Sequence, residues 1–222
     1  MGRRAVKGIH KSLDLAGVLV TFDELPDPWD TAAVFGDDRA AAPIEVEIGS
    51  GKGMFVRRAA AQRPEHNFLA VEIAHKYARF CAANLVRDGR DNGVVMSGDG
   101  ARLMQDRLPD GALEAVHVYF PDPWWKARHA KRRLMNNPDF LANVARTLRT
   151  GGALHFWTDV REYFEATVEF IAAEREANGL PLSGPEDVVE RPAEHDLDFH
   201  THFERRTRLN DQPVFRSRFV RQ

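Results

Sequence analysis

From about residue 44 onward, short apolar runs alternate with longer segments of helical periodicity. The apolar runs are rich in β-branched residues and are bounded by turn-forming residues. Such alternation is typical of a parallel sheet whose strands are joined by crossover helices, so the sequence predicts an α/β fold. The expected strands are Ile44–Ile48, Phe68–Glu72, Val94–Ser97, Ala115–Phe120 and Ala153–Thr158.

Helical segments follow most of these strands, so we expect helices on both faces of a mostly parallel, twisted sheet. The expected helices are Met54–Gln62, His75–Asp88, Pro138–Leu148 and Arg161–Glu176. After Gly179, prolines change the pattern, and two further strand-like runs follow, His202–Arg206 and Val214–Val220. These runs predict an antiparallel C-terminal hairpin at the edge of the sheet.

The first 40 residues fit no regular pattern apart from a short helix expected at Trp29–Phe35, because Pro26 and Pro28 interrupt them. At 222 residues, the chain is long enough to bury one core of this class. We therefore expect an N-terminal arm, residues 1–40, followed by one α/β domain, residues 41–222.

Composition excludes several classes of protein. The apolar runs are too short to cross a membrane, and no signal peptide is evident, so we expect a cytoplasmic protein without a membrane partner. Cys81 is the single cysteine, which excludes intrachain disulfides, and its helical context predicts a buried thiol. The net charge is only −2, but basic residues gather around residues 126–133 and 205–221, where they are suited to face an anion.

Three alternating glycines, Gly49, Gly51 and Gly53, stand between the first expected strand and the first expected helix. Open α/β sheets bind ligands at this carboxyl edge. The turn lacks the Lys-Ser or Lys-Thr ending of a phosphate loop, and its third glycine comes one residue too early for the dinucleotide fingerprint. Glu47 would repel a pyrophosphate but suits the ammonium of a methionine moiety. The turn therefore predicts S-adenosylmethionine as cofactor, with an NAD-dependent oxidoreductase as the alternative.

Two more carboxylates stand at the ends of later strands. Glu72 is suited to accept hydrogen bonds from ribose hydroxyls, and Asp99 from an adenine amino group. Either acid could instead cap a helix or stabilise a turn. Three acids at successive strand ends nevertheless favour a nucleoside-binding site.

The segment from Val118 to Arg133 is the most unusual in the chain. Pro121 and Pro123 restrict the backbone on both sides of Asp122 and so hold its carboxylate in one place. Two tryptophans and a basic run follow directly. A solvated, proline-stiffened loop is the alternative interpretation.

This Phe-Pro-Asp-Pro-Trp turn and the Arg-His-x-Lys-Arg-Arg run, on a Glu-x-Gly-x-Gly-x-Gly scaffold, resemble the bacterial tRNA (guanine-N7)-methyltransferases. The resemblance extends to Val71–Ile73, Thr158–Asp159 and Thr201–Arg205, and it covers residues 44–221. It implies a Rossmann-like class I methyltransferase fold. It also implies methyl transfer from S-adenosylmethionine to N7 of guanine 46 in the variable loop of tRNA.

The resemblance implies roles for individual residues as well. Asp122 would be central to catalysis and would line the cofactor site together with Glu47, Glu72 and Asp99. The implied substrate and RNA contacts are Lys126, Arg128, His129, Lys131, Arg132, Arg133, Asp159, Thr201, His202, Phe203 and Glu204. His202 stands where lysine is frequent, which removes a permanent charge, and Trp125 stands where proline or histidine is common.

Guanine N7 carries an in-plane lone pair and no proton, so positioning should dominate catalysis. We hypothesise that Asp122 stabilises the positive charge that develops on the purine. The Asp122-Pro-Trp-Trp125 turn is loosely similar to the Asp-Pro-Pro-Tyr turn of exocyclic-amine methyltransferases, so that activity stays open. A non-catalytic RNA-binding role also stays open, because a fold alone does not prove activity.

A metal site is the last possibility that the sequence raises. His195, His200, His202 and Glu204 lie close together in the chain but supply no complete set of ligands, so no metal is predicted. Monomer and homodimer both stay open.

Overall fold

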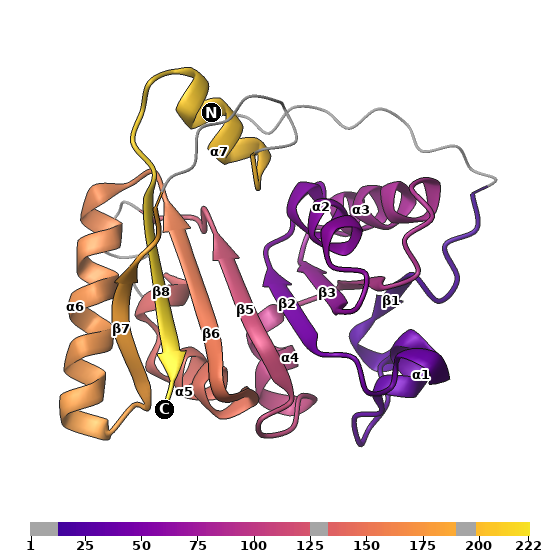
Figure 1. Cartoon of the computed structure of the whole chain (residues 1–222), viewed down its shortest axis with the longest axis horizontal. Coiled ribbons are helices and arrows are strands. Elements are labelled where there is room, and N and C mark those ends of the chain that lie inside the picture. Colours follow the sequence, from indigo (N-terminus) through magenta and orange to yellow (C-terminus); the bar gives the residue numbers. More distant parts are fainter. Residues whose placement is uncertain (1–12, 125–132, 190–198) are drawn as a thin grey trace.

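The computed structural model describes residues 13–124, 133–189 and 199–222. In this part of the chain, eight strands form one sheet with the order β1-β4-β3-β2-β5-β6-β8-β7 (Figure 1). The strands are β1 (Leu19–Thr21), β2 (Ile44–Ile48), β3 (Asn67–Glu72), β4 (Gly93–Ser97), β5 (Leu113–Tyr119), β6 (Leu148–Thr158), β7 (Leu182–Asp187) and β8 (Phe215–Arg221). The α-helices are α1 (Thr31–Phe35), α2 (Met54–Gln62), α3 (His75–Arg87), α4 (Gly100–Asp106), α5 (Pro138–Thr147), α6 (Arg161–Asn178) and α7 (His202–Leu209).

Strands β1 to β6 pair in parallel, while β8 pairs antiparallel with both β6 and β7. Every residue of β2 and β3 is buried, because helices cover both faces of the central strands. The five strands and four helices expected between residues 44 and 176 are all present, although several of their ends differ by a few residues. The predicted α/β class and mostly parallel sheet are therefore confirmed.

The two faces of the sheet carry different helices. Val46, Leu69 and Val116 pair across three central strands and belong to one apolar core with residues of α4, α5 and α6. Phe68 and Ala70 face the opposite way and pack with residues of α2 and α3. Beyond the carboxyl ends of β5 and β6 lies α7 (Figure 1).

The expected strand at His202–Arg206 is wrong, because this segment forms α7. Thr201 begins the helix by accepting a hydrogen bond from the Glu204 amide, and helical spacing buries Glu204 and Thr207 together. The antiparallel edge itself is present, but β7 forms it with β8. Pro185 concealed β7 in the sequence, and it lies where the register shifts between Ser183 and Glu186.

The described part of the N-terminal arm packs against the sheet. β1 pairs in parallel with β4, with Leu19 opposite Val95. Phe22, Leu25 and Phe35 are buried in the core shared with α4 and α5. Only the short helix, α1, was expected in this region, and it begins two residues later than predicted. Among the described residues, no helix is both long enough and apolar enough to cross a membrane.

Candidate active site at the carboxyl edge of the sheet

The carboxyl ends of the parallel strands bring the predicted acids to one edge of the sheet. Glu47 is the penultimate residue of β2, Glu72 ends β3, and Asp99 follows β4 by two residues. Asp122 and Asp159 follow β5 and β6. This is the edge at which open α/β sheets bind their ligands.

The glycine turn is held in a conformation that suits glycine. Gly51 and Gly53 have φ values of +55° and +75°, in the left-handed region. A Cβ on Gly53 would also lie 2.2 Å from Sγ of Cys81, which is fully buried in α3. The prediction of a buried thiol is confirmed, and the thiol fills the space behind the turn.

Glu72 connects the end of β3 to this turn. One carboxylate oxygen accepts a hydrogen bond from the Gly51 amide at 2.8 Å, and the other accepts one from the Ala74 amide at 2.9 Å. Two backbone donors fix the carboxylate, and Glu72 is only 4% exposed. Glu72 therefore does stabilise the turn and the start of α3, as the alternative interpretation expected. Its binding of ribose hydroxyls stays a prediction.

Glu47 is buried beside Glu72, and its Oε2 has no hydrogen-bond partner among the described residues. Burial and the neighbouring Glu72 carboxylate raise the pKa of Glu47 to about 8, although a hydrogen bond from the Val56 amide opposes the shift. The carboxyl is therefore mostly protonated at pH 7. A buried oxygen without a partner is costly, and a cationic donor would satisfy it.

Asp99 caps α4, because its Oδ1 accepts a hydrogen bond from the Ala101 amide at 2.8 Å. Between Glu72 and α3 lies Ile73, an apolar side chain that is 75% exposed. Sequence reasoning missed Ile73, although its place directly after the strand-ending acid was a usable signal. The edge of the sheet thus offers one exposed apolar side chain beside its acids.

The turn that carries Asp122 is held by its neighbours. Phe120 and Trp124 have φ values of 51° and 44°, which bulky side chains rarely adopt. The Phe120 amide donates to the Trp157 carbonyl at 2.8 Å, and Nε of Arg133 donates to the Pro123 carbonyl at the same distance. Asp122 itself is exposed at the tip of this turn.

The predicted RNA contacts outside α7 fall into two groups, those described by the structure and those outside the described residues. Arg133 lies beside the Asp122 turn, and Asp159 is exposed directly after β6. The remaining basic residues, Lys126, Arg128, His129, Lys131 and Arg132, lie outside the described residues, as does Trp125.

Four predicted site residues, 201–204, lie at the N-terminal end of α7, and their side chains differ in exposure. His202 and Phe203 are exposed, whereas the Glu204 carboxylate is buried and bonded within the protein. Although the residue is exposed, partial desolvation of its ring and the nearby positive charges of Lys52 and Arg205 lower the pKa of His202, which favours its neutral form. In the described part of the chain, no three potential metal ligands lie close enough to hold an ion.

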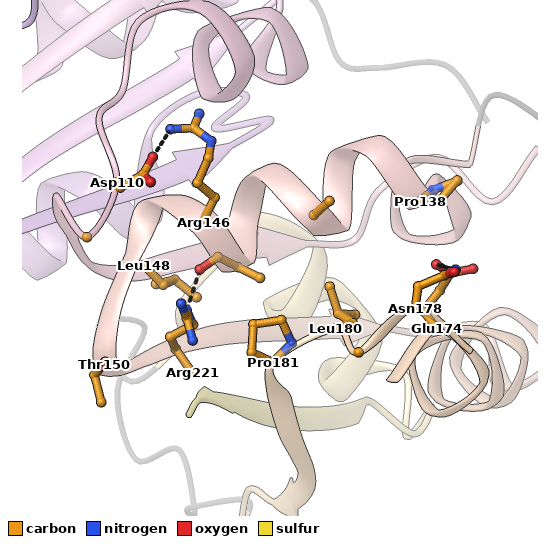
Figure 2. A pocket seen from close by; sticks show the side chains of 14 residues that line it. Asp110, Pro138, Arg146, Leu148, Thr150, Glu174, Asn178, Leu180, Pro181 and Arg221 are labelled. Carbon is orange, nitrogen blue, oxygen red and sulfur yellow. Dashed lines mark hydrogen bonds and ion pairs between the residues drawn. The ribbon is translucent and has the colours of Figure 1, made fainter. Parts of the chain in front are cut away.

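A pocket of about 500 Å³ lies at the opposite end of β6 from Asp159. Figure 2 shows Leu148, Arg146 and Arg221 along its wall, with Arg146 bonded to Asp110. Arg221 donates to the Ala145 carbonyl at 2.8 Å. The pocket contains none of the predicted site residues and does not belong to the candidate site.

The chain matches a family described as putative methyltransferase over residues 41–217. It is 48% identical over 221 residues to the tRNA (guanine-N(7)-)-methyltransferase of Rhodopirellula baltica, covering 97% of this chain and 79% of that protein. It is 36% identical over 190 residues to the protein of the same name from Yersinia enterocolitica, covering 85% of this chain and 77% of that protein.

Solved structures confirm the fold. The 16S rRNA methyltransferase KamB superposes with a TM-score of 0.64 at 17% identity, over 87% of this chain and 95% of that chain. An aminoglycoside resistance methyltransferase gives a TM-score of 0.58 at 16% identity, over 84% and 91%. The fold is the predicted Rossmann-like class I methyltransferase fold, and the sequence matches show that the chain belongs to the tRNA (guanine-N(7)-)-methyltransferase family.

Proposed function

We propose that this protein transfers the methyl group of S-adenosylmethionine to N7 of guanine in tRNA, at position 46 of the variable loop. The observation that carries the proposal is the 48% identity to a tRNA (guanine-N(7)-)-methyltransferase over almost the whole chain. The acids gathered at the carboxyl edge of the sheet support it. A tRNA substrate also implies a cytoplasmic enzyme.

The residues at this edge fit the proposed cofactor. Oε2 of Glu47, buried without a partner, suits a cationic ammonium group, and the glycine turn allows the backbone to approach a ligand closely. Glu72 holds the turn and would accept from ribose hydroxyls, while Asp99 and Ile73 would bind the adenine by its amino group and its face. When bound, S-adenosylmethionine supplies an electrophilic methyl group on a sulfonium.

Asp122 is the proposed catalytic residue. Its carboxylate stands on a turn fixed by two prolines, by strained flanking residues and by Arg133. N7 needs no deprotonation, so the Asp122 carboxylate would not act as a base. It would accept hydrogen bonds from the Watson-Crick edge of the guanine and stabilise the positive charge that develops on the purine. A preorganised group costs no reorganisation at the moment of reaction.

The RNA surface would comprise the basic run from Lys126 to Arg133, Asp159, and the exposed part of α7 with His202 and Phe203. Lysine and arginine on phosphates supply affinity and register rather than base specificity. The target base must leave its stack, and an exposed aromatic ring such as Phe203 would offer it a new stacking surface.

The test is methyl transfer from labelled cofactor to an unmodified tRNA transcript, with a transcript in which guanine 46 is replaced as control. Digestion of the product should give 7-methylguanosine. A methyl group on an exocyclic amine would instead support the second enzymatic candidate, which the Asp-Pro-Trp-Trp turn keeps open. Calorimetric titration with NADH should give no binding, whereas S-adenosylmethionine should bind.

A further inference from the structure

The carboxylate of Glu204 is occupied by bonds within the protein. The residue is 1% exposed. One oxygen accepts from the His200 amide at 2.6 Å, and the other lies 3.1 Å from a guanidinium nitrogen of Arg216 and 3.4 Å from one of Arg208. Burial alone would raise the pKa of Glu204, but the bonds from His200 and Arg216 outweigh it and lower the pKa to about 2. Glu204 is thus an ionised internal anchor.

The anchor joins α7 to the sheet. Arg216 lies on β8, pairs in register with Trp157 on β6, and has a side chain that is 5% exposed. Its guanidinium carbon lies 4.9 Å from the centre of a Trp157 ring, and it donates to the Val214 carbonyl at 3.0 Å. Both side chains of the Glu204–Arg216 pair are buried, so moving α7 away from β8 would leave an uncompensated charge, and the pair therefore specifies where α7 lies.

The exposed side of the same helical turn touches the catalytic turn. Phe203 stacks on Phe120, with ring centroids 6.0 Å apart and planes 20° from parallel. Phe120 is the residue with φ of 51°, two positions before Asp122. A left-handed phenylalanine persists only where its surroundings fix it, and Phe203 is one such contact.

We infer that the Glu204–Arg216 ion pair is a positioning device that sets α7 and, through the Phe203–Phe120 ring stack, the backbone that presents Asp122. The inference rests on the proposed catalytic role of Asp122. It assigns Glu204 to orientation of the catalytic turn rather than to contact with tRNA. Loss of the device should therefore lower kcat, because a misplacement of about 1 Å can cost about 10²-fold in rate.

A double-mutant cycle on kcat tests this coupling, with Glu204→Gln, Phe203→Leu and the combination. Each single variant should lower kcat by about 10- to 100-fold, and the combination should lower it no further, because both act through one contact. KM for S-adenosylmethionine should not change. Arg218→Gln is the matched control, since it breaks the exposed Arg218–Glu186 pair on the same strand and should leave kcat at the wild-type value.

Losses that multiply in the combined variant would overturn the inference, as would a rise in KM for tRNA at unchanged kcat in Glu204→Gln, which is the signature of a substrate contact. Should Glu204→Gln fail to fold, Arg216→Lys takes its place in the cycle with the same two outcomes, because lysine keeps the positive charge but not the guanidinium contact with Glu204. The wild-type protein and Asp122→Asn are measured in parallel. An inactive wild type would refute the proposed function, whereas an active wild type with multiplying losses would refute this coupling alone.

Discussion

Glu72 at the end of β3 accepts a hydrogen bond from the amide of Gly51 in the turn after β2, at 2.8 Å. Because the second oxygen of the same carboxylate accepts from Ala74, one side chain fixes both the glycine turn and the start of α3. The carboxylate therefore prepares the proposed cofactor site before it contacts any ligand.

Glu72→Ala should weaken the binding of S-adenosylmethionine by about 10- to 100-fold, since hydrogen bonds to a charged group contribute about 1.5–3 kcal/mol. Calorimetric titration measures this change. Glu114→Ala is the control, because Glu114, at the amino end of β5, pairs with Arg149 of β6 at the opposite edge of the sheet from the candidate site. Equal affinities for Glu72→Ala and the wild type would show that the carboxylate neither orders the turn nor touches the cofactor.

Gly53→Ala should lower the free energy of unfolding more than Gly17→Ala does. Both glycines have nearly the same φ, +75° and +73°, so the backbone strain of a Cβ is matched. Nothing lies within 4 Å of a Cβ on Gly17, whereas Sγ of Cys81 lies 2.2 Å from one on Gly53. Overpacking of this kind costs about 1–3 kcal/mol. Urea unfolding of both variants measures the difference.

Cys81→Ala added to Gly53→Ala tests the cause of that difference. Removing the sulfur should recover part of the lost stability, although a Cβ at residue 81 would still lie 3.0 Å away. Additive losses in the double variant would mean that the contact with Cys81 is not responsible.

Glu47 predicts a pH dependence of folding. Its pKa of about 8 in the folded protein lies above the ordinary value of 4.5. The stability of the wild type relative to Glu47→Gln should therefore be greatest below about pH 4.5 and fall by a few kcal/mol as the pH rises towards 8. Chemical unfolding of both proteins across this range measures the trend. A difference independent of pH would contradict a buried, protonated Glu47.

Cofactor binding should release the same proton. An ammonium group beside Glu47 would favour the ionised carboxylate, so binding at pH 7 should release close to one proton per site. Titration calorimetry in two buffers of different ionisation enthalpy counts that proton. Glu47→Gln should release none, and proton release equal to that of the wild type would place the ammonium elsewhere.

The sequence predicted those features of the fold that depend on interactions between residues close together in the chain. Alternating glycines after a buried strand predicted the turn and the exact limits of α2, and strand order predicted that the acids would meet at one edge. The fate of Glu204 could not be predicted in this way. Glu204 is buried because it pairs with Arg216 on β8, and nothing within residues 202–206 indicates that partner. The local pattern alone therefore predicted a strand where the protein forms α7. β1 could not be predicted either, because a strand of only three residues has no local pattern and forms through its pairing with β4.

Asp122→Asn should lower turnover by about 10²-fold or more, because it removes the charge of a preorganised carboxylate. Asparagine keeps the shape of the side chain, and Arg133 binds the turn through the Pro123 carbonyl rather than through Asp122. The affinity for tRNA should therefore change little. Single-turnover methyl transfer measures the rate, and filter binding measures the affinity. Turnover near that of the wild type would refute the catalytic role. A large loss of tRNA affinity with an unchanged single-turnover rate would instead make Asp122 a binding residue, because only an interaction made in the transition state alters the chemical step.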